Sequence, residues 1–186
     1  MRDWIVQLGD GDYQSTERVV PDDQLALLAA VEGRGPDEVA TMLAEGVPPA
    51  IRQNFWRSFS ESFPGFAGEQ VRELVVGKAE PFTLDGRRFA GVQLVFRERL
   101  GSGEIISLRD EQGRWWVDLL GTFGLALARP LEAWMQEVPS SAEGDRVRAA
   151  LARHRSSLQA ALERRPLGQP GEASVAALQR LIAELG

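Results

Sequence analysis

The sequence predicts an α+β fold in which N-terminal helices pack on a curved antiparallel meander of four or more strands, followed by a C-terminal helical hairpin. Apolar residues recur at helical spacing over residues 22–63, and strand-like alternation replaces that spacing over residues 71–120. Helical spacing returns after residue 122. We therefore expect an α+β cone-like domain over residues 1–138 and a helical appendage over residues 139–186.

The N-terminal third is predicted to hold a short strand and three helices. Four of the residues 4–8 are apolar and they precede a Gly-Asp turn, which indicates a strand. Helices are expected to begin near Asp22, at Pro36 and at Pro48, because aspartate and proline suit the first turn of a helix. The third helix carries phenylalanines four residues apart, which share one face: Phe55, Phe59 and Phe63.

The middle of the chain is predicted to form the antiparallel meander. The expected strands cover residues 71–78, 88–99, 104–109 and 114–120. The expected turns lie at Asp85-Gly86, at residues 101–103 and at residues 110–113. One face should form a hydrophobic wall for the helices: Ala90, Val92, Leu94, Phe96, Ile106, Leu108, Trp115, Val117 and Leu119. The other face is mixed and includes Arg97, Trp116 and Asp118, so we expect a ligand or partner there.

The C-terminal third is predicted to be helical throughout. Residues 123–138 contain Pro130, which indicates two short helices or one kinked helix. A long helix over residues 142–165 and a last helix over residues 172–185 should form an antiparallel hairpin. This hairpin docks on the domain or on a partner, and a homodimer is one assembly it would support.

Composition excludes several kinds of function. A chain of 186 residues can bury a sufficient core without disulfides or metal. It has no cysteine, which excludes disulfides and thiolate metal sites. The formal net charge of −6 argues against nucleic-acid binding, which needs a surplus of basic side chains. Lys78 is the only lysine, and the arginine skew is typical of a GC-rich genome. Asp10 and Asp12 lack the remaining ligands of a calcium loop, so no metal or cofactor is expected.

The sequence also predicts where the protein works. No segment approaches the roughly 18 consecutive apolar residues of a membrane span. The N-terminus lacks the apolar core of a signal peptide. We therefore expect a cytoplasmic protein that does not bind membranes, or an extracytoplasmic one if a leader has been removed.

Two titratable residues are candidates for chemistry. His154, the only histidine, falls on the apolar stripe of the long helix and is either a general base or a packing residue. Asp118 lies between Trp116 and Leu120. Burial against the indole would suit Asp118 as a general base, whereas an ion pair with Arg97 or Arg109 would give it a structural role.

The segment over residues 103–120, in which an acidic-Gly turn precedes Trp115-Trp116 and an apolar strand, resembles a known closing hairpin. It is similar to that of the nuclear-transport-factor-2-like superfamily of SnoaL/cystatin-like α+β cones, and the resemblance covers residues 22–125. It implies a pocket between the concave sheet and the helices. Members include ketosteroid isomerase, polyketide-cyclase-like enzymes and binding domains without activity. The enzymes place Asp, His or Tyr in that pocket, but Tyr13 and His154 lie outside the matched region, so no catalytic residue is carried over.

These features lead to one main hypothesis and two alternatives. The main hypothesis is a non-enzymatic domain that binds a small apolar ligand or a protein segment. Trp116 and Phe59 would supply apolar area, and Arg97 and Asp118 would orient the ligand. The first alternative is an isomerase or hydratase with Asp118 as base. The second is a structural adaptor or oligomerisation protein that acts through its C-terminal helices.

Overall fold

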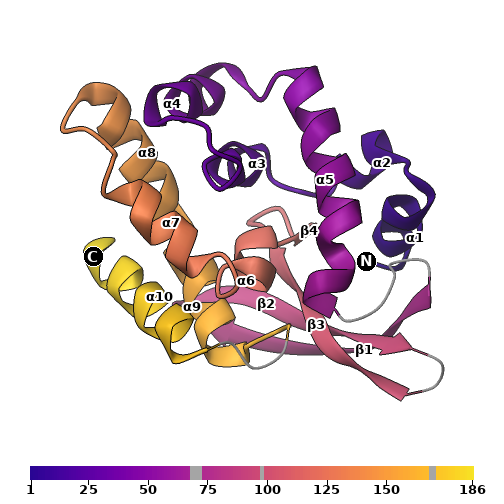
Figure 1. Ribbon diagram of the computed structural model, residues 1–186. Coiled ribbons are helices and arrows are strands. Elements are labelled where there is room, and N and C mark those ends of the chain that lie inside the picture. The colour runs from indigo at the N-terminus through magenta and orange to yellow at the C-terminus, as the bar shows by residue number, and fades with distance from the viewer. Residues whose placement is uncertain (68–72, 97–98, 168–170) are drawn as a thin grey trace.

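Helices, a four-stranded antiparallel sheet and further helices follow one another along the chain (Figure 1). The computed structural model describes residues 1–67, 73–96, 99–167 and 171–186. The N-terminal helices are α1 (Arg2–Asp10), α2 (Tyr13–Glu17), α3 (Asp22–Ala29), α4 (Pro36–Glu45) and α5 (Pro49–Ala67). The strands are β1 (Leu74–Leu84), β2 (Arg87–Phe96), β3 (Arg99–Arg109) and β4 (Trp115–Val117). The C-terminal helices are α6 (Leu119–Phe123), α7 (Ala128–Met135), α8 (Ala142–Arg153), α9 (Arg155–Arg164) and α10 (Glu172–Glu184). The predicted α+β class is thus confirmed.

The three predicted N-terminal helices are confirmed as α3, α4 and α5, but the predicted strand at residues 4–8 is wrong. These residues lie in helix α1, where Trp4, Ile5 and Leu8 are all buried. Their spacing places them on one helical face, which packs into the core beside Trp56 of α5. Gly11 ends the helix in the left-handed conformation, with φ of 77°, and its backbone N–H donates to carbonyls of the last helical turn.

The sheet has the order β1-β2-β3-β4 and confirms the predicted meander. Asp85 and Gly86 both adopt positive φ, as a tight hairpin turn between β1 and β2 requires. The predicted turn at residues 101–103 is wrong, because Phe96 already pairs with Arg99 and residues 101–103 lie inside β3. Arg97 lies outside the described residues.

The register of β3 differs by one residue from the prediction, and this exchanges its two faces. Val92 pairs with Ile105, and Ser107 pairs with Val117, so Ile105 rather than Ile106 faces the large core. Trp115, expected on the hydrophobic wall, is 47% exposed.

Both faces of the sheet are covered, including the face predicted to be mixed. Leu94 and Ile105 belong to the large core shared with the N-terminal helices. On the other face, a smaller cluster contains Phe89, Ile106 and Leu108 together with Ala160 of α9. Helix α9 therefore occupies part of the surface on which the sequence predicted a ligand.

The predicted helix over residues 142–165 is broken at His154, which ends α8 and begins α9 with φ of −98° and ψ of 12°. The C-terminal segment therefore contains α8, α9 and α10 rather than a two-helix hairpin. Side chains from all three, including Leu151, Leu158 and Leu178, lie in the same hydrophobic core as Leu27 of α3. No helix within the described ranges is long and apolar enough to cross a membrane.

Candidate functional site

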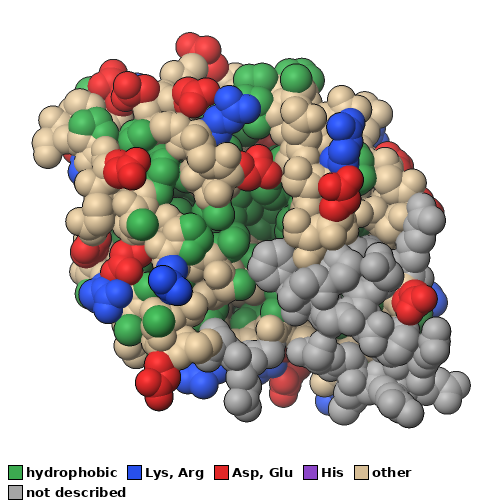
Figure 2. Space-filling view, in the orientation of Figure 1, with side chains coloured by type: hydrophobic (Ala, Val, Ile, Leu, Met, Phe, Trp, Pro, Cys, Tyr) green, Lys and Arg blue, Asp and Glu red, His purple; other side chains and the backbone are tan. Residues whose placement is uncertain are grey.

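A small apolar pocket opens between α3, α5 and the segment that joins α6 to α7. Its volume is about 120 Å³. Figure 2 shows a hollow on this face, floored by hydrophobic side chains and lying between α5 and the helices α3 and α4. The pocket is lined by Leu28, Val31, Glu32, Phe55, Ser58, Phe59, Ser62, Phe123 and Leu127.

The aromatic wall of the pocket comes from the phenylalanine spacing on α5. Phe55 and Phe59 lie one turn apart and stack with ring centroids 5.7 Å apart. Phe59 also meets Phe123 of α6 edge to face at 4.9 Å. Rings packed in these geometries have few alternative positions, so the wall is largely preformed.

A buried glutamine links α3 to the start of α6, the two helices that line the pocket opposite α5. Gln24 of α3 is fully buried, and its Nε2 donates to Asp118 Oδ1 at 2.9 Å. Its Oε1 accepts from the backbone N–H of Leu120 at 3.1 Å. Leu28 lies one turn further along α3, and Phe123 lies at the end of α6. The Gln24 contacts therefore set the position of α3 relative to α6, and with it the width of the pocket.

Asp118 is the N-cap of α6 and not a residue of the last strand, so its predicted position on a sheet face is wrong. β4 ends at Val117, and the fully buried Asp118 Oδ1 accepts from the Gly121 N–H at 2.9 Å. A Cβ on Gly121 would lie 2.7 Å from Asp118 Oδ2, so the cap needs glycine at this position. The carboxylate thus starts the helix that carries Phe123 into the pocket.

His154 extends the buried polar cluster to the break between α8 and α9. Its Nδ1 lies 3.4 Å from Gln24 Nε2, and its Nε2 lies 2.9 Å from Asp23 Oδ2. Because Gln24 Nε2 is a donor, Nδ1 acts as the acceptor, whereas His154 Nε2 is close to Asp23 but is not aligned for a hydrogen bond to it. Burial alone would raise the pKa of Asp23, but the close contact with the His154 ring and the positive charge of Arg153 lower it. Both ring nitrogens thus lie close to side chains of α3, which ties the break between α8 and α9 to that helix.

Glu32 is the one charged residue in the pocket lining. The side chain is exposed at the rim, yet desolvation by the neighbouring residues raises the pKa of its carboxyl above the usual value, and the nearby Arg34 opposes that shift. Across the described residues, Glu32 takes part in no ion pair, because Arg34 pairs with Glu38 instead. Nor does this part of the chain contain a group of three or more His, Asp or Glu side chains that could hold a metal ion.

The structure gives the predicted site residues different surroundings. Phe59 lines the pocket, whereas Asp118 is not part of the lining and caps α6, the helix that carries Phe123. Trp116 pairs with Leu108 across the sheet, and its Nε1 donates to Asp110 Oδ2 at 2.9 Å. Arg97, as stated, is outside the described residues. Sequence reasoning missed Glu32 and Leu127, and the helical spacing of Leu28 and Val31 is a signal for the α3 side of this pocket that was available.

Comparison of the chain with protein-family models, with curated proteins and with solved structures gave no match. The chemistry of the pocket therefore carries the functional assignment. That chemistry consists of a preformed apolar surface, two serine hydroxyls at the rim and one carboxylate that pairs with no cation in the described parts of the chain.

Proposed function

We propose that this protein is a non-enzymatic binding domain whose pocket at Phe59 receives one apolar side chain from a segment of a partner protein. The observation that carries the proposal is the size of the pocket. A volume of about 120 Å³ is slightly less than the roughly 150 Å³ of an apolar cavity that holds benzene. Pockets for drug-sized molecules measure about 300–1,000 Å³. One leucine or phenyl side chain matches this volume, and a whole metabolite exceeds it.

The rim specifies the chemistry around that side chain. Glu32 lies exposed at the rim and has no ion-pair partner among the described residues. A partner that buried Glu32 further without neutralising it would pay a large desolvation cost. The partner segment should therefore carry Lys or Arg near its apolar anchor. The net charge of −6 favours approach of such a basic segment.

The position of Asp118 supports binding rather than acid–base catalysis. Asp118 is fully buried, its Oδ1 accepts two hydrogen bonds, and it is not part of the pocket lining. A general base must come within hydrogen-bonding distance of the proton that it removes. The alternative of an isomerase that uses Asp118 would need this cap to open.

A peptide-display selection tests the proposal. We expect the wild-type protein to enrich peptides with one bulky apolar residue beside a basic residue. The variant Ser62→Trp fills the pocket from its exposed rim and should weaken binding of those peptides at least about tenfold, because the anchor side chain loses its place. The matched control is Gln53→Trp, an exposed position on α5 that does not line the pocket.

Two results would refute the proposal. One is that the selected peptides share no apolar anchor. The other is that Ser62→Trp and Gln53→Trp bind them equally well, which would place the contact on another surface.

A further inference from the structure

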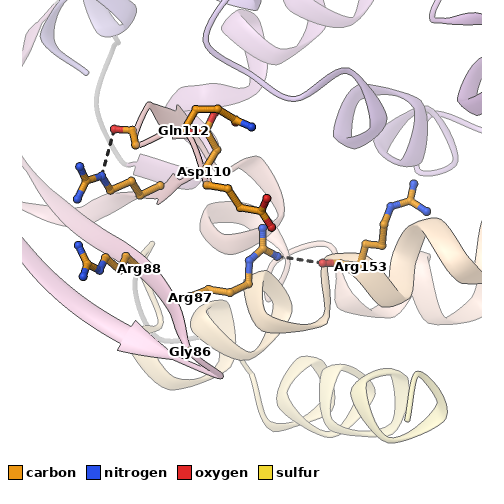
Figure 3. A pocket seen from close by; sticks show the side chains of 9 residues that line it. Gly86, Arg87, Arg88, Asp110, Gln112 and Arg153 are labelled. Carbon is orange, nitrogen blue, oxygen red and sulfur yellow. Dashed lines mark hydrogen bonds between the residues drawn. The ribbon is translucent and has the colours of Figure 1, made fainter.

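A second groove, distinct from the Phe59 pocket, lies at the end of the sheet next to α8 (Figure 3). It measures about 990 Å³ and is formed by the β1–β2 turn, the β3–β4 turn and the last residue of α8. Four arginines contribute to its lining: Arg87, Arg88, Arg109 and Arg153. This concentration of positive charge is notable in a chain whose net charge is −6.

Two of these arginines face each other across neighbouring strands. Phe89 pairs with Leu108, so the next position in the same antiparallel ladder sets Arg88 opposite Arg109. Thr83 pairs with Arg88, and Trp115 pairs with Arg109, so a hydroxyl and an exposed indole flank the two guanidinium groups. Like charges at opposing positions destabilise a sheet, and an anion between them would reverse the sign of that interaction.

The acidic residues of the groove do not neutralise this charge. Asp110 is already committed: its Oδ2 accepts from Arg114 Nε at 2.8 Å and from Trp116 Nε1 at 2.9 Å. Arg153 lies 3.7 Å from Asp23. In the ranges that the structure describes, Arg87, Arg88 and Arg109 pair with no carboxylate within 4 Å. Glu111 is the remaining acidic residue of the lining.

Two guanidinium groups are held in place by backbone carbonyls, which leaves further N–H groups available. Arg109 Nε donates to the carbonyl of Gly113 at 3.1 Å, and Arg87 Nη1 donates to the carbonyl of Arg153 at 3.0 Å. Figure 3 shows that Arg87 reaches toward α8, whereas Arg88 extends to the opposite side of the groove. A guanidinium has five N–H donors, so each arginine can still bind an oxyanion through two of them.

We propose that this groove binds a multiply charged oxyanion, with one anionic group between Arg88 and Arg109 and a second near Arg87. The volume exceeds what one phosphate or carboxylate would fill, and the arginines lie on two sides of it. Phosphate and carboxylate groups share the fork geometry that guanidinium recognises, so the shared chemistry is an oxyanion with at least two charges. This inference is independent of the proposed function of the Phe59 pocket.

The test uses the full chain labelled with 5-fluorotryptophan and followed by fluorine NMR at low ionic strength. The chain has five tryptophans, and the variant Trp115→Phe assigns the signal of the indole beside Arg109. The probes are inorganic pyrophosphate and citrate. We expect at least one of them to shift the Trp115 signal saturably. A response to pyrophosphate alone identifies a phosphate ligand, a response to citrate alone identifies a carboxylate ligand, and a response to both identifies a general oxyanion site.

Variants then locate the site. Arg88→Gln and Arg109→Gln should each weaken binding about tenfold or more, because each removes a charge-assisted pair of hydrogen bonds. Glu111→Gln should tighten binding, because it removes a repelling charge. Arg57→Gln, at an exposed position on α5, is the matched control and should leave binding unchanged. If Arg109→Gln unfolds the β3–β4 turn, Arg88→Gln and Glu111→Gln still decide the question.

Three results would overturn the proposal. The first is no saturable shift with either probe up to about 10 mM, which would mean a Kd weaker than about 10 mM. The second is equal weakening by Arg57→Gln and Arg88→Gln, which would indicate non-specific attraction to charge. The third is unchanged or weaker binding in Glu111→Gln.

Discussion

Replacing Gln24 with leucine should cost the protein a large part of its stability. The side chain is fully buried and contacts three groups: Asp118 Oδ1, the Leu120 N–H and His154 Nδ1. A leucine of similar size offers none of these partners a hydrogen bond. Each buried polar group left unpaired costs about 1–3 kcal/mol.

The three partners do not lose equally. Asp118 keeps its bond from Gly121, and the contact with His154 is long at 3.4 Å. We therefore take values near the lower end for these two and expect a total loss of about 3–5 kcal/mol. A typical domain has about 5–15 kcal/mol of stability, so this one substitution should remove about a fifth of it or more.

Urea denaturation followed by circular dichroism measures this loss. The slope with urea should stay constant and the midpoint should fall. Gln53→Leu, the same substitution at an exposed position of α5, should change stability by about 0.5 kcal/mol or less. A loss below about 1 kcal/mol for Gln24→Leu would refute the reasoning, because it would mean that relaxation or water satisfies the three partners.

Three further predictions concern single residues. Glu32→Gln should raise the urea midpoint at pH 7, because the raised pKa means that the ionised form of Glu32 disfavours the folded state. This gain in stability should vanish as the pH falls below 4.5, where wild-type Glu32 is protonated in both states. Asp110 should have a pKa of about 2 in carboxyl NMR, because Trp116 and then Arg114 hydrogen-bond to it. The stabilisation from this carboxylate should be present above pH 3.8 and be lost as the pH falls through about 2. Trp116→Phe should move the pKa of Asp110 back toward 3.8. Gly144→Ala should destabilise the protein by about 2 kcal/mol or more in thermal unfolding, because the added Cβ would collide with the Pro139 carbonyl. Alanine normally favours a helix over glycine, so a stabilised variant would contradict this prediction.

Local signals in the sequence were sufficient for much of the fold. Proline and aspartate at helix starts located α3, α4 and α5, and Asp85-Gly86 located the first hairpin turn. Each of these features acts within a few residues along the chain. They could therefore be recognised without knowing what packs against them.

The errors arose where distant contacts decide the structure. Trp4, Ile5 and Leu8 suit a helix or a strand, and packing beside Trp56 selects the helix. Asp118 continues an apolar alternation, yet it caps α6 through Gly121, and its burial depends on Gln24, which is far away in sequence.

The candidate pocket shows the same limit. Phe59 could be chosen from its spacing on α5, because a helical face is a local property. Glu32 and Leu127 come from segments that meet only in the folded chain. No local pattern marks them as neighbours.

The contacts of Gln24 also bear on the order of events during folding. They join positions 94 and 130 residues apart, whereas each strand of the sheet pairs with its neighbour along the chain. Closing such long loops costs entropy that nearby hairpins do not incur. The meander can thus form early, and the buried amide finds its partners only after the terminal segments have docked. Gln24→Leu should then speed unfolding in stopped-flow measurements while leaving the refolding rate nearly unchanged.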